Sequence, residues 1–292
     1  MSVDYPEWVA APRTEALGAR EAGSDRPRRR VGRLLTHVAS ARRTVDLLAA
    51  LTAADLRFRY GRGPFQIVRW LFDPFALVGV YLVLVTLVLD RSGTAPGLSI
   101  ACAIVPFQLV MLGVANAMGA ITLRAPIITN MAFRRTLIPL SSVLTEAVAF
   151  GASLLLIALM MGVYNVAPTP AITWLPVVLT VNLVLAAGFA YPASLFALWF
   201  RELKPFALSF VRVLFFLGPG LVPLSETSES ARRVLQLNPL TGLFESYRDV
   251  FLYGESVSAW NLLYPFAFGL ALLMLFVPLY RREQREFAKV VG

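Results

Sequence analysis

Six long apolar runs constrain this chain more than any other feature of its sequence. Short polar or basic segments separate them. About 20 consecutive apolar residues are needed for a helix to cross the hydrocarbon core of a bilayer. Only 15% of the 292 residues are charged, well below the roughly 25% of soluble proteins. We therefore expect an all-α integral membrane protein with six transmembrane helices, at Pro74–Leu89, Leu98–Ile121, Leu137–Val163, Ile172–Phe200, Phe206–Val222 and Asn261–Leu279.

The distribution of cations predicts the orientation of these spans. The net charge is +9, and most cations flank apolar runs, where they meet lipid headgroups rather than nucleic acid. A cytoplasmic N-terminus and an even number of spans place the C-terminus in the cytoplasm as well. The external side then holds few cations, as the positive-inside rule requires: Arg91, Arg232, Arg233 and Arg248. The predicted parts are a disordered basic tail (1–43), an interface region (44–73), a six-span domain (74–280) and a basic C-terminal tail (281–292).

The segment Leu51–Pro74, just before the first run, is basic, aromatic and apolar at once. Its apolar residues continue one helical face that begins at Leu47 and ends at Phe58. Such a helix lies in the membrane surface rather than across it. We expect an amphipathic interface helix that meets a cytoplasmic partner. The alternative is a juxtamembrane stretch that only anchors the first span.

The external loop Leu224–Trp260 carries strong helix signals. Asn238-Pro239 is typical of an N-cap and first helical residue, and Gly254 of a C-terminal cap. A second helix is plausible over Ser228–Leu237, and the fifth run breaks at Gly218-Pro219-Gly220. We expect a re-entrant pair of helices that gates the exit, with its apolar stripe against the membrane rim or a neighbouring protomer. The alternative is an ordinary amphipathic hairpin. The gate residues are Gly218, Gly220, Leu240, Phe244, Tyr247 and Phe251.

The sequence carries no pattern that predicts catalysis. It contains no G-x-x-x-x-G-K-[ST] phosphate loop, so we expect no nucleotide site in this chain. The only histidine, His37, lies in the tail, and no cluster of metal-ligand residues is present, so we expect no metal site and no catalytic residues. This argues against a membrane-embedded transferase.

Two ionisable residues lie within apolar runs, at similar predicted depths. Charged groups inside a membrane usually face protein or water and are often functional. We expect Arg212 to line a translocation path and to pair with Glu146; the alternatives are a snorkelling arginine and a structural carboxyl. The path is expected to be aromatic, which suits sugars, and to include Phe75, Tyr81, Phe215 and Phe216.

Three groups of residues resemble motifs of the permease subunits of type 2 ABC transporters that export polysaccharides or polyol phosphates. The resemblance covers about residues 45–285. The first motif is an interface segment, the second is the loop entering the third span, and the third precedes the last span. They are Asp55-Leu56 with Arg59-Tyr60, Arg62, Trp70 and Pro74; Asn130 with Phe133-Arg134-Arg135 and Ile138-Pro139-Leu140; and Asn238-Pro239-Leu240 with Arg248 and Gly254.

The resemblance implies a homodimeric permease in a bacterial plasma membrane, with no cofactor of its own. Two separate ATPase subunits would bind ATP and Mg²⁺, and the cargo would be a lipid-diphosphate-linked glycan such as galactan or O-antigen. The residues expected to couple to the ATPase are Asp55, Arg57, Arg59, Arg134 and Arg135. The rivals are a drug or small-lipid exporter of the same fold, a transferase, and a passive channel.

Overall fold

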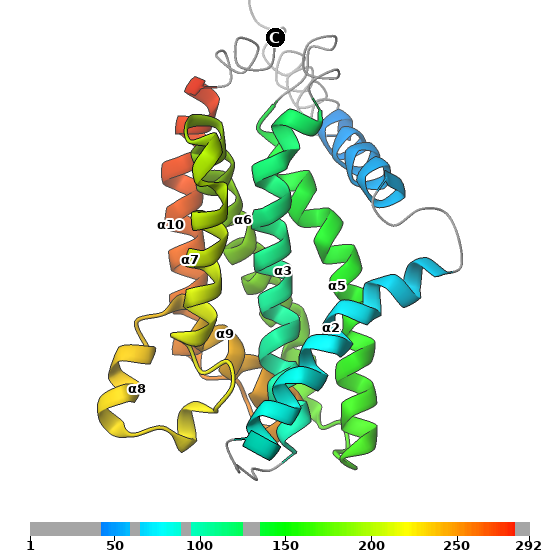
Figure 1. Ribbon diagram of the computed structural model, residues 1–292, viewed down its shortest axis with the longest axis vertical. Helices are drawn as coiled ribbons and strands as arrows, with labels where there is room; N and C mark the ends of the chain where they lie inside the picture. Colours follow the sequence, from blue (N-terminus) through cyan, green and yellow to red (C-terminus); the bar gives the residue numbers. More distant parts are fainter. Residues whose placement is uncertain (1–41, 59–64, 89–94, 125–134, 284–292) are drawn as a thin grey trace, which may run out of the picture. The chain divides into compact units, whose positions relative to one another are not determined.

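The computed structural model describes residues 42–58, 65–88, 95–124 and 135–283 (Figure 1). The chain divides into two units, Met1–Leu47 and Leu48–Gly292. The described residues of the first unit, 42–47, are helical, and everything below concerns the second unit.

Every regular element in the described part of the second unit is helical. Residues 48–58 are helical, where the interface helix is predicted, and we keep that name; its position at a membrane surface stays a prediction. The others are α2 (Phe65–Val83) with the π-helical η1 (Leu84–Val88), α3 (Pro96–Leu123), α5 (Leu137–Val163), η2 (Pro170–Trp174), α6 (Leu175–Trp199), η3 (Arg201–Leu203), α7 (Lys204–Phe216), η4 (Leu224–Glu226), α8 (Glu229–Leu235), α9 (Pro239–Arg248), the π-helical η5 (Asp249–Tyr253) and α10 (Ala259–Glu283).

Four of the described helices are long and apolar enough to cross a membrane. They are α3, α5, the continuous Pro170–Trp199 and α10. The other two predicted spans are shorter: the apolar part of α2 is Pro74–Val83, and α7 has 13 residues because the chain breaks before Gly218-Pro219-Gly220. The all-α membrane class is confirmed, whereas six complete spans are not. Trp174, Trp199 and Trp260 lie exposed at helix ends, as expected for membrane interfaces.

Helix α3 forms the centre of this unit. It packs against α2, α5, α6, α7 and α9, and α10 packs against α6 and α9. Most of its length is buried, including Cys102 and Val105. Because α3 is apolar all round rather than on one stripe, its sequence is typical of a helix surrounded by protein. The C-terminal ends of α3 and α10 and the start of α7 lie at one end of the bundle, which we call the basic end (Figure 1). The opposite end, where α8 lies, is called the α8 end.

Helices α6 and α10 approach so closely that their glycines face each other. A Cβ atom added at Gly188 would lie 2.7 Å from the carbonyl oxygen of Gly269 and 2.9 Å from its Cα. Both neighbours are backbone atoms, so neither can turn aside. Small residues allow this kind of close helix contact in membranes.

We expect Gly188→Ala to destabilise the protein by about 1–3 kcal/mol, because the added methyl group forces the two helices apart. Thermal unfolding of the detergent-purified protein measures this. Gly151→Ala is the matched control, since a Cβ there meets nothing within 4 Å. An unchanged melting temperature for Gly188→Ala would contradict the close contact.

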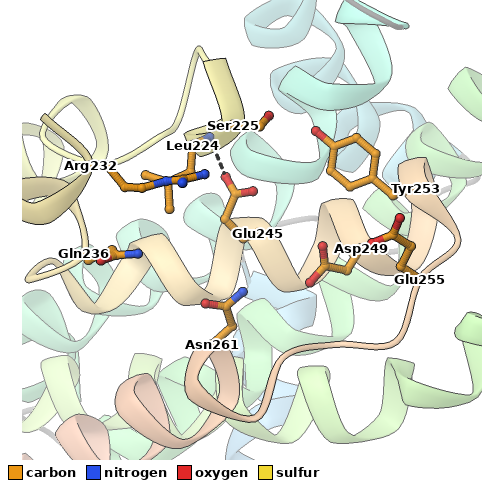
Figure 2. Close-up of a pocket in the computed structure, with 9 residues that line it drawn as sticks. All are labelled: Leu224, Ser225, Arg232, Gln236, Glu245, Asp249, Tyr253, Glu255 and Asn261. Carbon is orange, nitrogen blue, oxygen red and sulfur yellow. Dashed lines mark hydrogen bonds between the residues drawn. The ribbon is translucent and has the colours of Figure 1, made fainter. Parts of the chain in front are cut away.

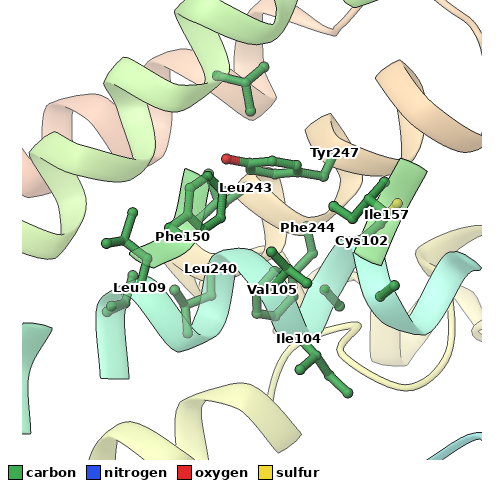
Figure 3. Close-up of a cluster of buried hydrophobic side chains, with 14 of the residues drawn as sticks. Cys102, Ile104, Val105, Leu109, Phe150, Ile157, Leu240, Leu243, Phe244 and Tyr247 are labelled. Atoms are coloured by element: carbon green, nitrogen blue, oxygen red, sulfur yellow. The ribbon is translucent and has the colours of Figure 1, made fainter. Parts of the chain in front are cut away.

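Helix α9 is part of the core rather than a surface helix. Leu240, Leu243, Phe244 and Tyr247 are fully buried and pack with α3 residues such as Val105 and with Phe150 of α5 (Figure 3). The expectation that the membrane rim or a neighbouring protomer covers this stripe is wrong, because the protomer's own helices cover it. The apolar stripe correctly predicted that these side chains are buried, but it did not indicate which surface covers them.

The local signals at the ends of α9 are confirmed. The Asn238 side chain accepts a hydrogen bond from the Leu240 N–H at 3.0 Å, and Pro239 is the first helical residue. Gly254 ends η5 with a φ of 68°, a left-handed conformation that glycine adopts without strain. The upstream helix also exists as α8, which has no buried residues. A re-entrant course of these helices is not confirmed.

Candidate functional site

The most deeply buried charge among the described residues is Arg248, at the end of α9. Its side chain is 0% exposed. The guanidinium donates to the Ser99 hydroxyl at 3.0 Å, to Glu245 Oε1 at 2.7 Å and to the Gly220 carbonyl at 3.3 Å. These partners come from α3, from α9 itself and from the chain break after α7. One arginine therefore ties three separate segments together at the α8 end.

Glu245 extends this network to the next segment. Its Oε1 atom also accepts the Leu224 N–H at 3.1 Å. The chain between α7 and α8 has left helical geometry, so its backbone groups need other partners in an environment with little water. Arg248 satisfies a carbonyl and Glu245 satisfies an amide there. The external side predicted for Arg248 stays a prediction, and its side chain is the buried donor of this network.

A polar cavity of about 400 Å³ adjoins the network. The residues labelled in Figure 2 come from η4, from α8 and the residue that follows it, from α9, from η5 and the loop after it, and from the start of α10. Its lining combines three carboxylates with an arginine, two amides and two hydroxyl groups. The lining residues are Leu224, Ser225, Arg232, Gln236, Glu245, Asp249, Tyr253, Glu255 and Asn261.

Asp249 is the titratable group of this cavity with a strongly shifted pKa. Burial is the main cause, followed by the negative charges of Glu245 and Glu255. Arg248 and a hydrogen bond from Asn261 oppose these effects. Together they raise the pKa of Asp249 from 3.8 to about 7. At neutral pH this carboxyl group is therefore partly protonated.

The stability of the protein is expected to depend on pH through Asp249. A carboxyl whose pKa is raised in the folded state binds more protons there than in the unfolded state, so stability falls as pH rises from about 4 to 7. We expect the melting temperature of the wild type to decrease by several degrees between pH 5 and pH 8. Asp249→Asn should flatten this slope, whereas Glu229→Gln, on the exposed face of α8, should not. Equal slopes for wild type and Asp249→Asn would contradict the shift.

A second ionic network lies at the basic end. Arg124, which follows α3, is 5% exposed and forms an ion pair with Asp55 of the segment 42–58. The same guanidinium donates to the Ile138 carbonyl of α5 at 3.2 Å, and the Thr145 hydroxyl lies 3.5 Å from the Asp55 carboxylate. The interface helix is therefore fixed to the ends of two long helices that flank residues 125–134.

The predicted coupling residues differ in how far the structure describes them. Asp55 is half-buried in this ion pair and Arg57 is exposed on the same helix. Arg135 is half-buried just before α5. Arg59 and Arg134 lie outside the described residues, so their predicted role stays a prediction. Arg124 is not among the predicted coupling residues, although a lone arginine directly after a long apolar run marks a helix end.

The predicted aromatic residues do gather, although not along one open surface. Tyr81 of α2 lies 5.9 Å from Phe215 and 6.3 Å from Phe216 of α7, measured between ring centroids. Phe215 is buried and also contacts Phe107 and Phe244. Phe216 is 56% exposed, and Phe75 is half-buried against the core. Only part of the set therefore faces outward.

The structure does not pair Arg212 with Glu146. Glu146 is 2% exposed and accepts a hydrogen bond from Asn116, which links α5 to α3. Arg212 is exposed on α7, and among the described residues no ion pair joins the two side chains. The predicted pair is wrong because equal depth along two helices does not make them neighbours. Asn182 of α6 forms a further interhelical hydrogen bond, because its amide donates to the Tyr247 hydroxyl of α9 at 3.3 Å.

Comparison with known proteins gives a consistent result. No family profile matches the chain. An O-antigen export system permease protein, RfbA, of Myxococcus xanthus is 27% identical over 248 residues, which cover 84% of this chain and 95% of that protein. Two proteins of the same name from Klebsiella pneumoniae are 24% and 23% identical, with the same coverage. These similarities confirm the resemblance of the chain to the permease subunits of type 2 ABC transporters that export polysaccharides.

Proposed function

We propose that this chain is the membrane subunit of an ABC exporter that carries a lipid-diphosphate-linked polysaccharide to the outer face of a bacterial plasma membrane. The observation that carries this proposal is the similarity to O-antigen export permeases along 84% of the chain and 95% of each relative. Two permease copies and two copies of a separate ATPase, which binds ATP and Mg²⁺, form the working complex. The cargo is a galactan or an O-antigen-like glycan.

The basic end supports an ATPase-docking role. The ion pair between Asp55 and Arg124 fixes a partly exposed helix to α3, and the Ile138 contact extends this connection to α5. A force applied to that helix by a cytoplasmic partner therefore reaches two long helices directly. This arrangement suits a subunit that converts ATP hydrolysis elsewhere into movement of its own helices. With the basic end facing the cytoplasm, both termini are cytoplasmic.

The proposal is tested by co-expressing the permease with candidate ABC ATPases from the same genome. We expect the two proteins to purify together from membranes, with ATPase activity in the complex and a lipid-linked glycan detected by mass spectrometry of bound lipids. Complementation of a bacterium that lacks its own O-antigen permease measures export. A complex that hydrolyses ATP but neither binds nor exports any lipid-linked glycan would overturn the proposed cargo.

A second candidate function is export of a small apolar molecule or lipid by the same complex. An apolar groove of about 600 Å³ between α3, α6, α7 and α10 favours it, because aromatic rings dominate its walls. Its aromatic lining residues are Phe189, Phe196, Trp199, Phe206, Phe210, Phe268 and Phe276. Transport of apolar dyes that glycan precursors fail to inhibit would favour this function over the first.

Arg212 is proposed to contact the diphosphate of the carrier lipid. It lies eight residues into α7, about 12 Å from the helix start, and its side chain is exposed. An arginine binds phosphate through two parallel hydrogen bonds and keeps its charge when buried. We expect Arg212→Ala to abolish polysaccharide export and Arg212→Lys to retain part of it. Lys204→Ala, at the start of the same helix, should export normally; normal export by Arg212→Ala would leave snorkelling as the explanation.

The gate is proposed to open through α8 rather than α9. The gate residues Leu240, Phe244, Tyr247 and Phe251 are buried in the core, so moving α9 would break the bundle. By contrast, α8 has no buried residues and follows the break at Gly218 and Gly220. A cysteine pair that locks α8 to the start of α10 should stop export, and reduction should restore it. Full export in the locked state would make α8 a static cover.

A further inference from the structure

We propose that the polar cavity between α8, α9, η5 and α10 is a saccharide-binding subsite at the external end of the permease (Figure 2). This inference rests on the proposed function, which places the α8 end of the permease outside the cell. It assigns a ligand class to residues that take no part in docking or in the predicted path. The cavity volume of about 400 Å³ lies within the range of small-ligand pockets.

The lining offers both hydrogen-bond donors and acceptors. Arg232 and the amides of Gln236 and Asn261 donate, whereas the carboxylates of Asp249 and Glu255 accept. The hydroxyls of Ser225 and Tyr253 do both. A sugar presents adjacent hydroxyl groups that also donate and accept, so it can engage this mixed set without leaving either kind of group unused.

The charges of the cavity point to a neutral ligand rather than a cation. Glu245 is offset by Arg248, whose nitrogen lies 2.7 Å away. Asp249 has a pKa of about 7, so it carries only part of a charge at neutral pH. Arg232 lines the same cavity and balances the charge of Glu255. Among the described residues, no three His, Cys, Asp or Glu side chains group to hold a metal ion.

Arg232 also carries an unused donor. Its Nε atom is shielded from solvent, and no hydrogen-bond partner for it exists among the described residues. A buried donor without a partner is costly, and a bound group would relieve that cost only after the side chain turns its Nε toward the cavity. Figure 2 shows the Arg232 side chain at the wall formed by α8, facing Glu245 of α9. The Arg232 side chain thus lies on the cavity side of the helix that we propose to move.

The walls of the cavity explain how a subsite here would act in export. Glu245, Asp249 and Asn261 belong to elements packed into the bundle, whereas Arg232 and Gln236 belong to α8 or its end. A saccharide bound between them bridges the fixed wall and the outer helix. Each sugar unit that leaves the protein would therefore be held at this position until α8 separates from α9.

The test uses the full permease in lipid nanodiscs and three soluble probes: methyl α-galactoside, methyl α-mannoside and N-acetylglucosamine. We expect at least one probe to show saturation transfer from the protein by NMR, with dissociation constants obtained by titration. Arg232→Met removes the donor but keeps the apolar stem, and should weaken binding about tenfold, as loss of a charge-assisted hydrogen bond implies. Gln236→Trp, at an exposed position, should fill the cavity and abolish binding.

Glu229→Gln is the matched control, because Glu229 lies on the exposed face of α8. This variant should bind the probes as the wild type does. Spermidine serves as a cationic probe. The proposal is overturned if no saccharide binds, if both cavity variants bind unchanged, or if spermidine binds more tightly than every sugar. Saccharide binding by a protein that exports no polysaccharide would support the subsite and overturn the proposed function instead.

Discussion

Replacing Arg248 with methionine is expected to leave little folded protein in the membrane. The substitution removes the donor to Ser99 and Gly220 and leaves the Glu245 carboxylate buried without its cation. Removing one partner of a buried ion pair typically costs about 3–5 kcal/mol, a large share of the total stability of a protein. We therefore expect strongly reduced expression and a clearly lower melting temperature in detergent.

The double variant Glu245→Gln with Arg248→Met should recover part of this loss. It removes both charges, and glutamine can still accept the Leu224 N–H through its carbonyl oxygen. Arg233→Met is the matched control, because Arg233 forms an exposed pair with Glu229 at 3.9 Å and such pairs contribute about 0–1 kcal/mol. A double variant no more stable than Arg248→Met would show that Arg248 acts through hydrogen bonds alone.

The second large effect is expected at the basic end. Asp55→Arg places a cation against the buried Arg124, and this repulsion should release the interface helix from α3 and α5. We expect polysaccharide export to fall to a few per cent of wild type while ATP hydrolysis by the co-purified complex continues. Arg124→Asp alone should have a similar effect.

The charge-swapped double variant, Asp55→Arg with Arg124→Asp, restores opposite charges at the same two positions. It should regain a substantial part of the export activity, although Arg124 no longer donates to the Ile138 carbonyl. Ala50→Arg, at an exposed position of the same helix, is the control and should export normally. No recovery in the double variant would mean that the ion pair does not carry the coupling.

The sequence predicts the helical membrane class because an apolar run of this length can satisfy its backbone hydrogen bonds in a membrane as a helix. It also predicts the ends of α9, since Asn238-Pro239 and Gly254 act through local backbone geometry. These signals depend on neighbouring residues only. They are therefore visible in one sequence without knowledge of the fold.

The contacts between distant segments are not visible in the same way. Ser99 and Arg248 lie 149 positions apart, and Asp55 and Arg124 lie 69 apart. Nothing in the sequence spacing indicates that these pairs meet. Sequence position alone therefore gives no sign that Arg248 is buried, and it suggests a pair of Arg212 and Glu146 only because both lie at similar predicted depths. The apolar stripe on α9 is visible in the sequence, but the sequence does not show which surface covers it.

The brevity of α7 has a consequence for the lipid around the protein. Its 13 residues extend about 20 Å, whereas the hydrocarbon core of a bilayer is about 30 Å thick. Phe206, Phe210 and Phe216 on this helix are exposed and therefore available to acyl chains. A bilayer meeting an apolar surface shorter than itself thins locally, at a cost of fractions of a kcal/mol per ångström. Beside α7 the membrane is accordingly expected to be thinner than elsewhere, which shortens the apolar distance between the headgroup layers at this side of the permease.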